Sequence, residues 1–394
     1  MTSEQDTTQA PTAAPTTSDG RAVSPAAVQV GQMLDYFGAE GCSDIHLTPS
    51  RGLWYVKDKQ TLPYEGMATI PQPFIDQLVD EFAHAHGDPF SDSGQLDSSF
   101  DIGGEYRGRL AARRTHAGTT MTFRIISRRI PTTAELELPA SLIETVRRPA
   151  GLLLFTGQTG SGKSTSIAAL VNDLNMTEPT SIYTLEDPIE YVYPEGTALV
   201  NQREVGEHVK SFAVGLENAK RSHPKIIIIG EIKSADTARA AVDAAASGHL
   251  VVSTMHAGST AEAIDGLISM FPPNEQPLIR THLSQVLLGV VVQMLIPRIQ
   301  GGLAMAQEIA FNTRTFSTML RGDGKEGGGN DMNLIQQYLL GPGRQERMQA
   351  MEVALKDLVV AGKITAEQAR NLARDQRVIH DELTTAGIQY TSKD

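Results

Sequence analysis

Cysteine is almost absent from this sequence, since Cys42 is the single one among 394 residues. One cysteine excludes a disulfide within the chain and a zinc site built from several cysteines, and it is typical of a protein in a reducing cytoplasm. The sequence also lacks an apolar run of the roughly eighteen residues that a membrane-spanning helix requires. Its N-terminus has no basic-then-apolar signal-peptide pattern. We therefore expect a cytoplasmic protein without direct insertion into a membrane.

An excess of basic residues is also missing. Lys and Arg number 34 against 46 Asp and Glu, so the formal net charge is -12 at pH 7. This balance argues against broad electrostatic binding to nucleic acid or to an anionic membrane, although it is compatible with a local basic channel. No stretch interleaves basic with aromatic residues, as surfaces for single-stranded nucleic acid do. What is present is a 40% hydrophobic content, enough for sizeable cores in a chain of about two or three domains.

The first third of the chain divides into a tail and a small domain. Residues 1–25 are rich in Thr, Pro and Ala with few large apolar side chains, which predicts a disordered tail. Residues 26–129 begin with helical spacing from Ala26 to Phe37 and continue with alternating strands. The expected strands are "SDIHLTP", "GLWYVKD", "FDIGGEYRGRLAARR" and "TTMTFRII". Together they predict a small α+β domain.

The rest of the chain changes character after a linker. Residues 130–141 carry two prolines and predict a linker. Residues 142–320 alternate apolar strands with helices, which predicts an α/β domain with a parallel sheet. Residues 321–394 contain a glycine cluster, expected to be a mobile loop, and then helices. Thr365, three residues before Gln368, predicts a capping box at the start of a last helix.

A phosphate-binding loop follows an apolar strand at 152–155 and precedes a helix. The pattern G-x-x-x-x-G-K-S lets backbone N–H groups surround phosphates, and the helix N-terminus adds its positive end. Lys163 would reach the β- and γ-phosphates, and the Ser164 hydroxyl would bind Mg²⁺. A glycine turn that matches by accident is the alternative, and the strand-loop-helix context argues against it. The nucleotide-binding residues are Gly157, Gln158, Thr159, Gly160, Ser161, Gly162, Lys163, Ser164 and Thr165.

The segment "IIIIGE" (226–231) predicts a buried strand that neighbours the strand of the phosphate loop. Ligands of parallel sheets bind at the C-terminal ends of strands, where Glu231 would orient and deprotonate a water molecule. A plain core strand is the alternative. Many nucleotide sites place a metal-holding aspartate just before this glutamate, but here the residue is Gly230. A carboxylate must therefore come from elsewhere.

The missing carboxylate is expected in "SIYTLEDPIEY" (181–191), an apolar strand adjacent to the strand at 226–231. Pro188 ends this strand, so Glu186 and Asp187 would lie beside the phosphates and hold Mg²⁺ through its water shell, or polarise the nucleophile. Another strand, within "SGHLVVSTMHAGS", has His249 before it and His256 after it. Opposite ends of one strand cannot form a metal pair. Solvated or core histidines are the alternative, but His256 would lie near the γ-phosphate.

These elements, in this order, resemble the secretion ATPase superfamily, which comprises the hexameric motors of type II secretion, type IV pili and type IV secretion. The strongest similarity is to the PilT-like pilus retraction ATPases. The matching motifs are "SDIHL", "GQTGSGKST", "LEDPIEY", "NQREVG", "IIIIGE", "GHLVVSTMH", "FPPNEQPLIRTHLSQVLLGVVVQML" and "GGLAMAQEI". The resemblance implies a RecA-like P-loop ATPase domain with a parallel sheet, preceded by a small α+β, PAS-like N-terminal domain.

The resemblance also implies roles. Glu231 matches the catalytic glutamate, Glu186 the acid of the Asp box, and His249 and His256 the two histidines of the His box. Arg109 and Arg124 match arginines that reach the nucleotide from the N-terminal domain. ATP and Mg²⁺ would be the cofactors, and the chain would form a homohexamer at the cytoplasmic face of the inner membrane. Its partner there would be a platform protein of a pilus or secretion machine.

Some segments depart from the family pattern. After Glu231 the family usually has Arg-Asp, and this chain has Lys233 and Ser234. The segment "TRTFSTMLRGDGKEGGG" departs from the motif associated with retraction. Pilus retraction is the leading hypothesis because the motifs resemble the PilT-like ATPases, and these departures favour keeping a type IVB secretion or conjugal-transfer ATPase as the alternative. A nucleic-acid translocase and a nucleotide-binding scaffold without turnover are remoter alternatives. The four-cysteine zinc element usual in pilus assembly ATPases is absent.

Overall fold

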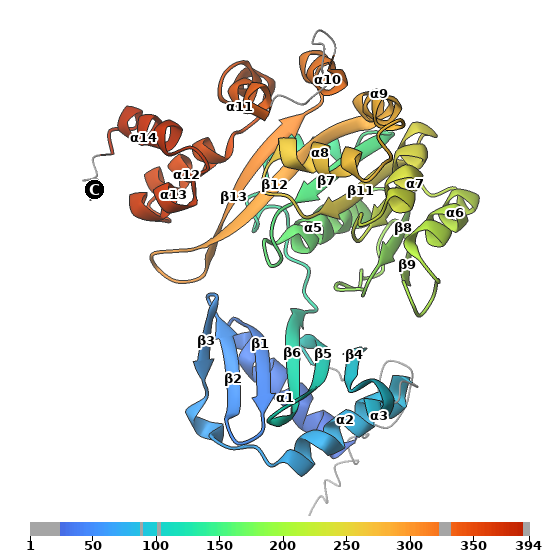
Figure 1. Ribbon diagram of the computed structural model, residues 1–394, viewed down its shortest axis with the longest axis vertical. Coiled ribbons are helices and arrows are strands. Elements are labelled where there is room, and N and C mark those ends of the chain that lie inside the picture. The colour runs from blue at the N-terminus through green and yellow to red at the C-terminus, as the bar shows by residue number, and fades with distance from the viewer. Residues whose placement is uncertain (1–23, 87–89, 101–103, 323–331, 389–394) are drawn as a thin grey trace, which may run out of the picture. The chain divides into compact units, whose positions relative to one another are not determined.

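The computed structural model describes residues 24–86, 90–100, 104–322 and 332–388. The chain forms two compact units, Met1–Arg129 and Ile130–Asp394, which are described separately (Figure 1). Residues 1–23 of the predicted tail, and 323–331 of the predicted glycine loop, lie outside the described residues. Residues 24 and 25 are not tail: helix α1 begins at Pro25, and the Ser24 hydroxyl caps it by accepting the N–H of Ala27.

The N-terminal unit is an antiparallel sheet with helices. Its strands pair in the order β3-β2-β1-β6-β5-β4, and every neighbouring pair is antiparallel. Its elements are α1 (Pro25–Ala39), β1 (Cys42–Thr48), β2 (Gly52–Lys57), β3 (Gln60–Pro63), a 3₁₀ turn at Glu65–Met67, α2 (Gln72–His86), α3 (Phe90–Ser93), β4 (Gln95–Phe100), β5 (Tyr106–Thr115) and β6 (Gly118–Ser127).

The core of this unit follows from the two-residue period of its strands. Ile45 of β1 lies opposite Phe123 of β6, and Leu47 lies opposite Met121. All four are buried together with apolar residues of α1 and α2. The predicted single strand at 100–114 is wrong, because Phe100 ends β4 and β5 begins only at Tyr106.

The C-terminal unit contains a seven-stranded sheet and many helices. Its strands are β7 (Gly151–Thr156), β8 (Ser181–Glu186), β9 (Leu199–Glu204), β10 (Ile226–Ile229), β11 (Leu250–Met255), β12 (Leu287–Pro297) and β13 (Leu303–Phe311). Its helices are α4 (Ala140–Thr145), α5 (Lys163–Thr177), α6 (Phe212–Ser222), α7 (Ala235–Ala246), α8 (Thr260–Ser269), α9 (Gln276–Val286), α10 (Arg314–Arg321), α11 (Met332–Leu340), a 3₁₀ turn at Pro342–Glu346, α12 (Met351–Val360), α13 (Ala366–Leu372) and α14 (Gln376–Thr385).

The strand order is β13-β12-β7-β11-β10-β8-β9. All neighbours are parallel except β12 and β13. The prediction that 226–231 neighbours the strand of the phosphate loop is wrong, since β11 lies between β10 and β7. The prediction that 181–186 lies beside β10 is confirmed, because Ile229 pairs with Leu185. Hence β7, β11, β10 and β8 stand side by side with their C-terminal ends at one edge.

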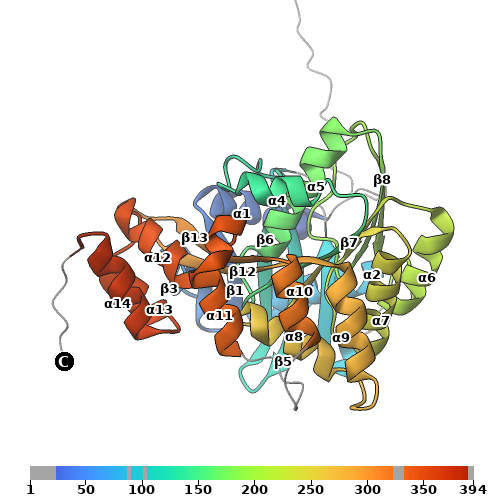
Figure 2. The ribbon, with the colours of Figure 1, turned by 90° about the horizontal axis from the view of Figure 1, so that it is seen from above.

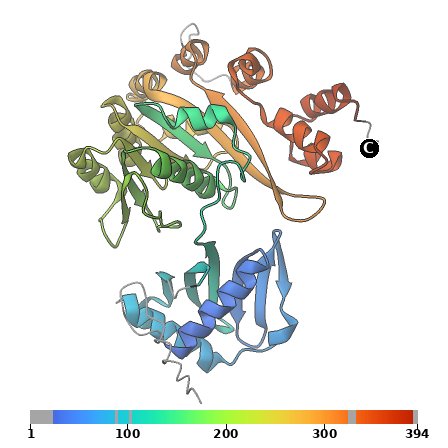
Figure 3. The same cartoon turned by 180° about the vertical axis from the view of Figure 1, so that it is seen from behind.

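Both faces of this sheet are covered, which explains its unbroken apolar strands. Leu153 and Phe155 of β7 pack in a cluster with residues of α4 and α5. Leu152 and Leu154 point to the opposite face and pack in the cluster that includes α6 to α9. Figure 2 shows α4 and α5 on one side of the sheet and α8 and α9 on the other. Figure 3 shows α5, in green, crossing the near face.

The described helices after residue 321 do not form a core of their own. They pack in the cluster that contains Leu152 and Leu154. Ile335 of α11, Leu355 of α12 and Ile379 of α14 belong to the same buried cluster as Leu152. The capping box of Thr365 and Gln368 is confirmed, but the expected last helix is two helices, α13 and α14. The predicted linker at 130–141 ends two residues early, because α4 already begins at Ala140. In the part of the chain that the structure describes, no helix has the length and apolarity needed to cross a bilayer.

Candidate active site

The phosphate loop joins the buried strand β7 to α5, which begins at Lys163. Gly157, Gly160 and Gly162 have φ angles of 143°, 73° and 85°, a region that side chains other than hydrogen rarely allow. A Cβ at Gly157 would lie 2.4 Å from the carbonyl oxygen of Gln293. These glycines therefore permit the tight turn that leads into α5, whose first N–H groups have no partner within the helix.

The polar groups of this loop fit a triphosphate. The Lys163 Nζ donates to the carbonyl oxygens of Gly157 (2.9 Å) and Gln158 (3.0 Å), and the residue is buried. Burial lowers the pKa of Lys163, while attraction to Glu231 and Glu190 acts in the opposite direction. The buried Ser161 Oγ has no hydrogen-bond partner. A buried cation held only by neutral carbonyls, beside an unsatisfied hydroxyl, is suited to receiving phosphate oxygens.

Glu231 lies just beyond β10, with both carboxylate oxygens occupied. Its Oε1 is 3.0 Å from the Nε2 of His256, and its Oε2 is 2.8 Å from the Nζ of Lys233. Its backbone is fixed as well, since the Ile232 N–H donates to the Thr254 carbonyl oxygen at 3.0 Å. The structure thus brings together two residues singled out in the sequence, Glu231 and His256. Lys163 is close enough to attract Glu231 electrostatically.

The glycine before Glu231 lies close to the backbone of β8. A Cβ at Gly230 would lie 3.3 Å from the Cα of Glu186 and from the carbonyl oxygen of Leu185. A side chain at this position would require the β8 backbone to move by a few tenths of an ångström. Glu186 ends that same neighbouring strand, so a carboxylate is near position 230, and its role in place of the missing one stays a prediction.

Glu186 is held in a polar network at the end of β8. Its Oε1 accepts hydrogen bonds from the Thr184 Oγ1 (2.7 Å) and the Gln202 Nε2 (3.1 Å). Burial raises the pKa of Glu186, and these hydrogen bonds oppose the shift without cancelling it. The carboxylate is therefore more desolvated than that of an ordinary surface acid. A perturbed acid of this kind is a candidate for proton transfer or for electrostatic stabilisation.

The raised pKa predicts how stability depends on pH in a Glu186→Gln variant. Folded Glu186 keeps its proton above the ordinary value of 4.5. The native state therefore binds more protons than the unfolded state between these two pKa values, and this residue's contribution to stability falls as pH rises through that window. Glutamine does not titrate. The Tm of Glu186→Gln minus that of wild type should therefore increase from about pH 4 to about pH 8, measured by calorimetry. An exposed control, Glu217→Gln, should show no such trend, and a flat difference for Glu186→Gln would contradict the shift.

The residues expected around Mg²⁺ fit a metal carried by the substrate. Ser164 lies in the first turn of α5, and Asp187 follows β8 with its side chain exposed. Among the described residues, no group of three His, Cys, Asp or Glu side chains could form a metal cage. Mg²⁺ typically keeps several waters and binds through few protein groups plus substrate phosphates. Ser164 and, through water, Asp187 would hold it here.

Three predicted site residues are not brought to this edge by the described contacts. His249 precedes β11, and its Nδ1 lies 3.1 Å from the Ala244 carbonyl oxygen, roughly 20 Å of strand from His256. A catalytic role for His249 thus has no geometric basis within this unit. Arg109 and Arg124 belong to the N-terminal unit, where they lie opposite each other on β5 and β6. Arg124 contacts Asp44 (Nε to Oδ1, 3.1 Å). Their roles at the nucleotide stay predictions.

Sequence reasoning missed several neighbours of the site. Lys233, which departs from the family pattern, is a partner of Glu231. Gln202 of β9, within the motif "NQREVG", contacts Glu186. The Tyr191 hydroxyl lies 3.1 Å from the Thr165 Oγ1 at the start of α5. The β8–β9 segment therefore touches both the acid and the phosphate helix, which no local pattern signals.

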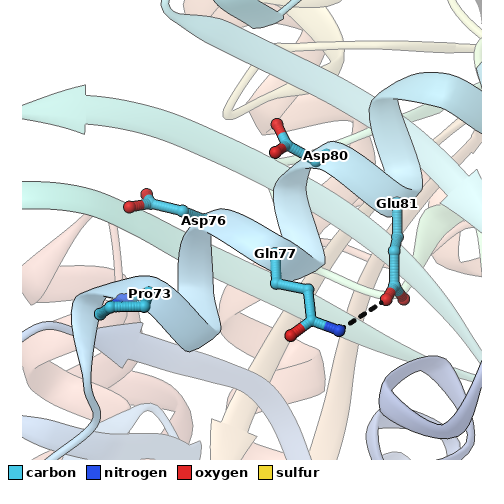
Figure 4. A pocket seen from close by; sticks show the side chains of 5 residues that line it. All are labelled: Pro73, Asp76, Gln77, Asp80 and Glu81. Atoms are coloured by element: carbon cyan, nitrogen blue, oxygen red, sulfur yellow. Dashed lines mark hydrogen bonds between the residues drawn. The ribbon is translucent and has the colours of Figure 1, made fainter.

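A surface depression on α2 offers different chemistry. Pro73, Asp76, Gln77, Asp80 and Glu81 line it, all from one helix of the N-terminal unit (Figure 4). The Gln77 Nε2 donates to the Glu81 Oε1 at 3.0 Å. Three acids and no cation make this lining unsuited to phosphate.

A glycine-rich phosphate loop, a glutamate and a second acid at the C-terminal edge of a parallel sheet define a P-loop nucleoside triphosphatase. The family described as "Type II/IV secretion system protein" matches residues 93–332. This is more than half of the chain, and the protein belongs to that family.

Individual relatives show which members of this family the chain resembles. A Pseudomonas aeruginosa protein described as "Type IV pilus retractation ATPase PilT" is 34% identical over 350 residues, 88% of this chain and 98% of the relative. A "Twitching motility protein" of Neisseria gonorrhoeae is 35% identical over 284 residues, 71% of this chain and 73% of the relative. The predicted membership of the secretion ATPase superfamily, near its PilT-like members, is confirmed.

Solved structures agree in fold. A crystal structure of the "Pilus Retraction Motor PilT and Bound ADP" matches with a TM-score of 0.74 at 32% identity, covering 89% of this chain and 99% of that chain. The ATPase DotB of Legionella pneumophila matches with a TM-score of 0.76 at 24% identity, covering 88% of this chain and 95% of that chain. At this identity the match is evidence for the fold only. The predicted fold class is confirmed: an α/β ATPase domain with a parallel sheet, preceded by a small α+β domain.

Proposed function

We propose that this protein is a hexameric, Mg²⁺-dependent ATPase motor that drives retraction of a type IV pilus. The observation that carries the ATPase activity is the contact between Glu231 and His256, at the sheet edge that also bears the phosphate loop. Retraction rests on similarity along nearly the whole length of a pilus retraction ATPase.

The site residues divide the work of hydrolysis. ATP binds the loop from Gly157 to Thr165, where Lys163 leaves its carbonyl partners for phosphate oxygens. Ser164 would hold Mg²⁺, which would supply Lewis-acid neutralisation of the phosphate charge. Glu231 orients the attacking water and accepts its proton. His256 contacts Glu231 and would sense the γ-phosphate, so that it couples the bound phosphate to the position of Glu231. Glu186 adds a carboxylate at the same edge of the sheet.

The N-terminal unit would supply the cationic part of the site. Arginine keeps its charge at any working pH, and its planar fork suits phosphate oxygens. Arg109 and Arg124 form a cross-strand pair that could stabilise developing charge when the unit, of the same or a neighbouring copy, closes on the nucleotide. Delivering charge from a second unit makes hydrolysis depend on closure, which is how a ring would convert ATP into movement.

The working place proposed for this motor is the cytoplasmic face of the inner membrane, against a platform protein of the pilus machine. A type IVB secretion or conjugal-transfer ATPase is the second candidate, since the segment after Thr313 departs from the retraction pattern. A nucleic-acid translocase is remoter, because the net charge is -12 and single-strand binding depends on a basic groove.

A gene deletion separates these functions. Cells without the motor should keep surface pili, because assembly continues, and should lose twitching, because pili no longer shorten. Wild-type protein should restore twitching, whereas Glu231→Gln protein should not. Surface pili, twitching and DNA transfer are scored together. Normal twitching with lost DNA transfer would replace retraction by conjugal transfer.

A further inference from the structure

The turn that carries His256 is fixed on one side by the strand of the phosphate loop. His256 follows β11 directly, and residues 257–259 lead into α8. The Thr156 Oγ1, at the end of β7, donates to the Ala257 carbonyl oxygen at 2.9 Å. This contact ties the residue after His256 to the residue before the phosphate loop.

The other end of the turn is fixed by a buried carboxylate of β13. Thr260, the first residue of α8, is fully buried. Its N–H and its hydroxyl both donate to the Oε1 of Glu308, at 2.8 Å each. A hydrogen bond from a backbone N–H to a carboxylate at a helix start is strong and directional. Thr260 therefore cannot move without breaking two bonds.

Glu308 is buried, and its second carboxylate oxygen binds another residue. It is 2% exposed, and its Oε2 accepts a hydrogen bond from the Arg374 Nη1 at 2.7 Å. Arg374 lies between α13 and α14. The Glu308 side of this ion pair is buried, but Arg374 is accessible to solvent, so the pair by itself gives little net stability. What it provides is a fixed geometry between β13, the start of α8 and the C-terminal helices.

We propose that Glu308 is a positioning residue that holds His256 against Glu231 through Thr260, with Arg374 keeping its charge paired. The inference rests on the proposed ATPase activity. When the two hydrogen bonds to Thr260 are lost, the turn keeps its contact at Ala257 but loses its anchor on β13, so the start of α8 can shift and change the position of His256. His256 then no longer holds the Glu231 carboxylate in place for the attacking water, whereas the phosphate loop keeps its own contacts. Turnover falls while nucleotide binding does not.

The test compares two double variants that both carry Arg374→Met, so that neither retains a charge that has lost its partner and the two differ only at position 308. Glu308→Gln with Arg374→Met keeps an amide oxygen for both donors of Thr260. Glu308→Leu with Arg374→Met has similar volume and removes that acceptor. Thr260→Val, which removes only the hydroxyl donor, is the milder variant if the leucine form does not fold. Arg344→Met is the control, since Arg344 pairs with Glu382 of α14 and does not touch Thr260.

The glutamine form and the Arg344→Met control should keep kcat within about twofold of wild type. The leucine form should lose about tenfold in kcat, as expected for a small misplacement of a catalytic group, with KM for ATP unchanged. Thr260→Val should fall between them. Without nucleotide, His256 should react faster with diethyl pyrocarbonate in the leucine form than in the glutamine form, because its Nε2 is released from Glu231. Mass spectrometry of the modified histidine gives this rate independently of turnover.

Equal kcat in the glutamine and leucine forms would overturn the positioning role. A parallel loss of kcat, ATP affinity and Tm, with unchanged His256 reactivity, would overturn it too, since that pattern is one of general destabilisation. Wild-type protein that does not hydrolyse ATP would refute the proposed function instead, and the His256 reactivity would still decide whether Glu308 positions it.

Discussion

The Glu231→Gln protein is expected to bind ATP as wild type does and to hydrolyse it about 10²- to 10⁴-fold more slowly, the usual contribution of a positioned general base. Glutamine has nearly the same shape but cannot accept the proton of the attacking water. It also loses the charge that holds His256 and Lys233 at 3.0 and 2.8 Å. ATP binding is measured with a fluorescent analogue, and turnover by phosphate release.

The matched control for this variant is Glu217→Gln, on the exposed end of an ion pair with Lys220 in α6. It should leave turnover unchanged. Glu231 is partly buried, so a small change in Tm is compatible with the prediction. Hydrolysis at the wild-type rate by Glu231→Gln protein would remove the catalytic assignment, and with it the reason for the contact with His256.

The second large effect is expected from Lys163→Ala. Without ligand, this change removes a buried cation that donates only to the Gly157 and Gln158 carbonyl oxygens and whose pKa is lowered by burial. The free protein should therefore not be destabilised. ATP binding should weaken roughly tenfold to hundredfold, because a charge-assisted hydrogen bond contributes about 1.5–3 kcal/mol, and hydrolysis should be lost.

Calorimetry separates lost binding from lost folding. The Tm of wild type should rise with ATP, because a ligand that binds only the folded state stabilises it, and the rise should disappear in Lys163→Ala protein. The control Lys220→Ala, in α6, should behave as wild type. A Lys163→Ala protein that still shows the full ATP-dependent rise would contradict the site.

The Lys163→Ala variant also tests whether Arg109 reaches the nucleotide from the same copy of the chain or from a neighbouring copy. Lys163→Ala chains keep Arg109, and Arg109→Ala chains keep the phosphate loop. Mixing the two inactive proteins should restore part of the turnover when the arginine comes from a neighbouring copy. No recovery, from chains that sedimentation shows to be mixed rings, would place the arginine in the same copy as the phosphate loop.

Much of the site followed from local pattern. A glycine loop between an apolar strand and a helix is a short-range arrangement, so Lys163 and Ser164 were located without a tertiary model. The acids Glu186 and Glu231 were located as well, because each follows an apolar run that can only be a buried strand. Parallel strands end at a common edge, which was enough to predict that the two acids face the same ligand.

The neighbours of those residues required the folded chain. The order of strands put β11 between β7 and β10, which corrected the predicted adjacency and gave His256 its contact with Glu231. The position of β8 showed that its backbone lies close to residue 230. His249, which the family resemblance grouped with His256, lies at the other end of its strand. The placement of Arg109 and Arg124 against the nucleotide depends on how two units meet, which a motif does not encode.

The sequence by itself determined the nucleotide chemistry and the family, because both reside in short segments whose residue types and spacing are needed for binding phosphate. Only the tertiary structure decided which side chains hold the catalytic ones. Glu308 lies 48 positions from Thr260 and 66 from Arg374, and no pattern of apolar residues or glycines connects them. Contacts across such separations arise from the packing of β13 against α8 and the C-terminal helices.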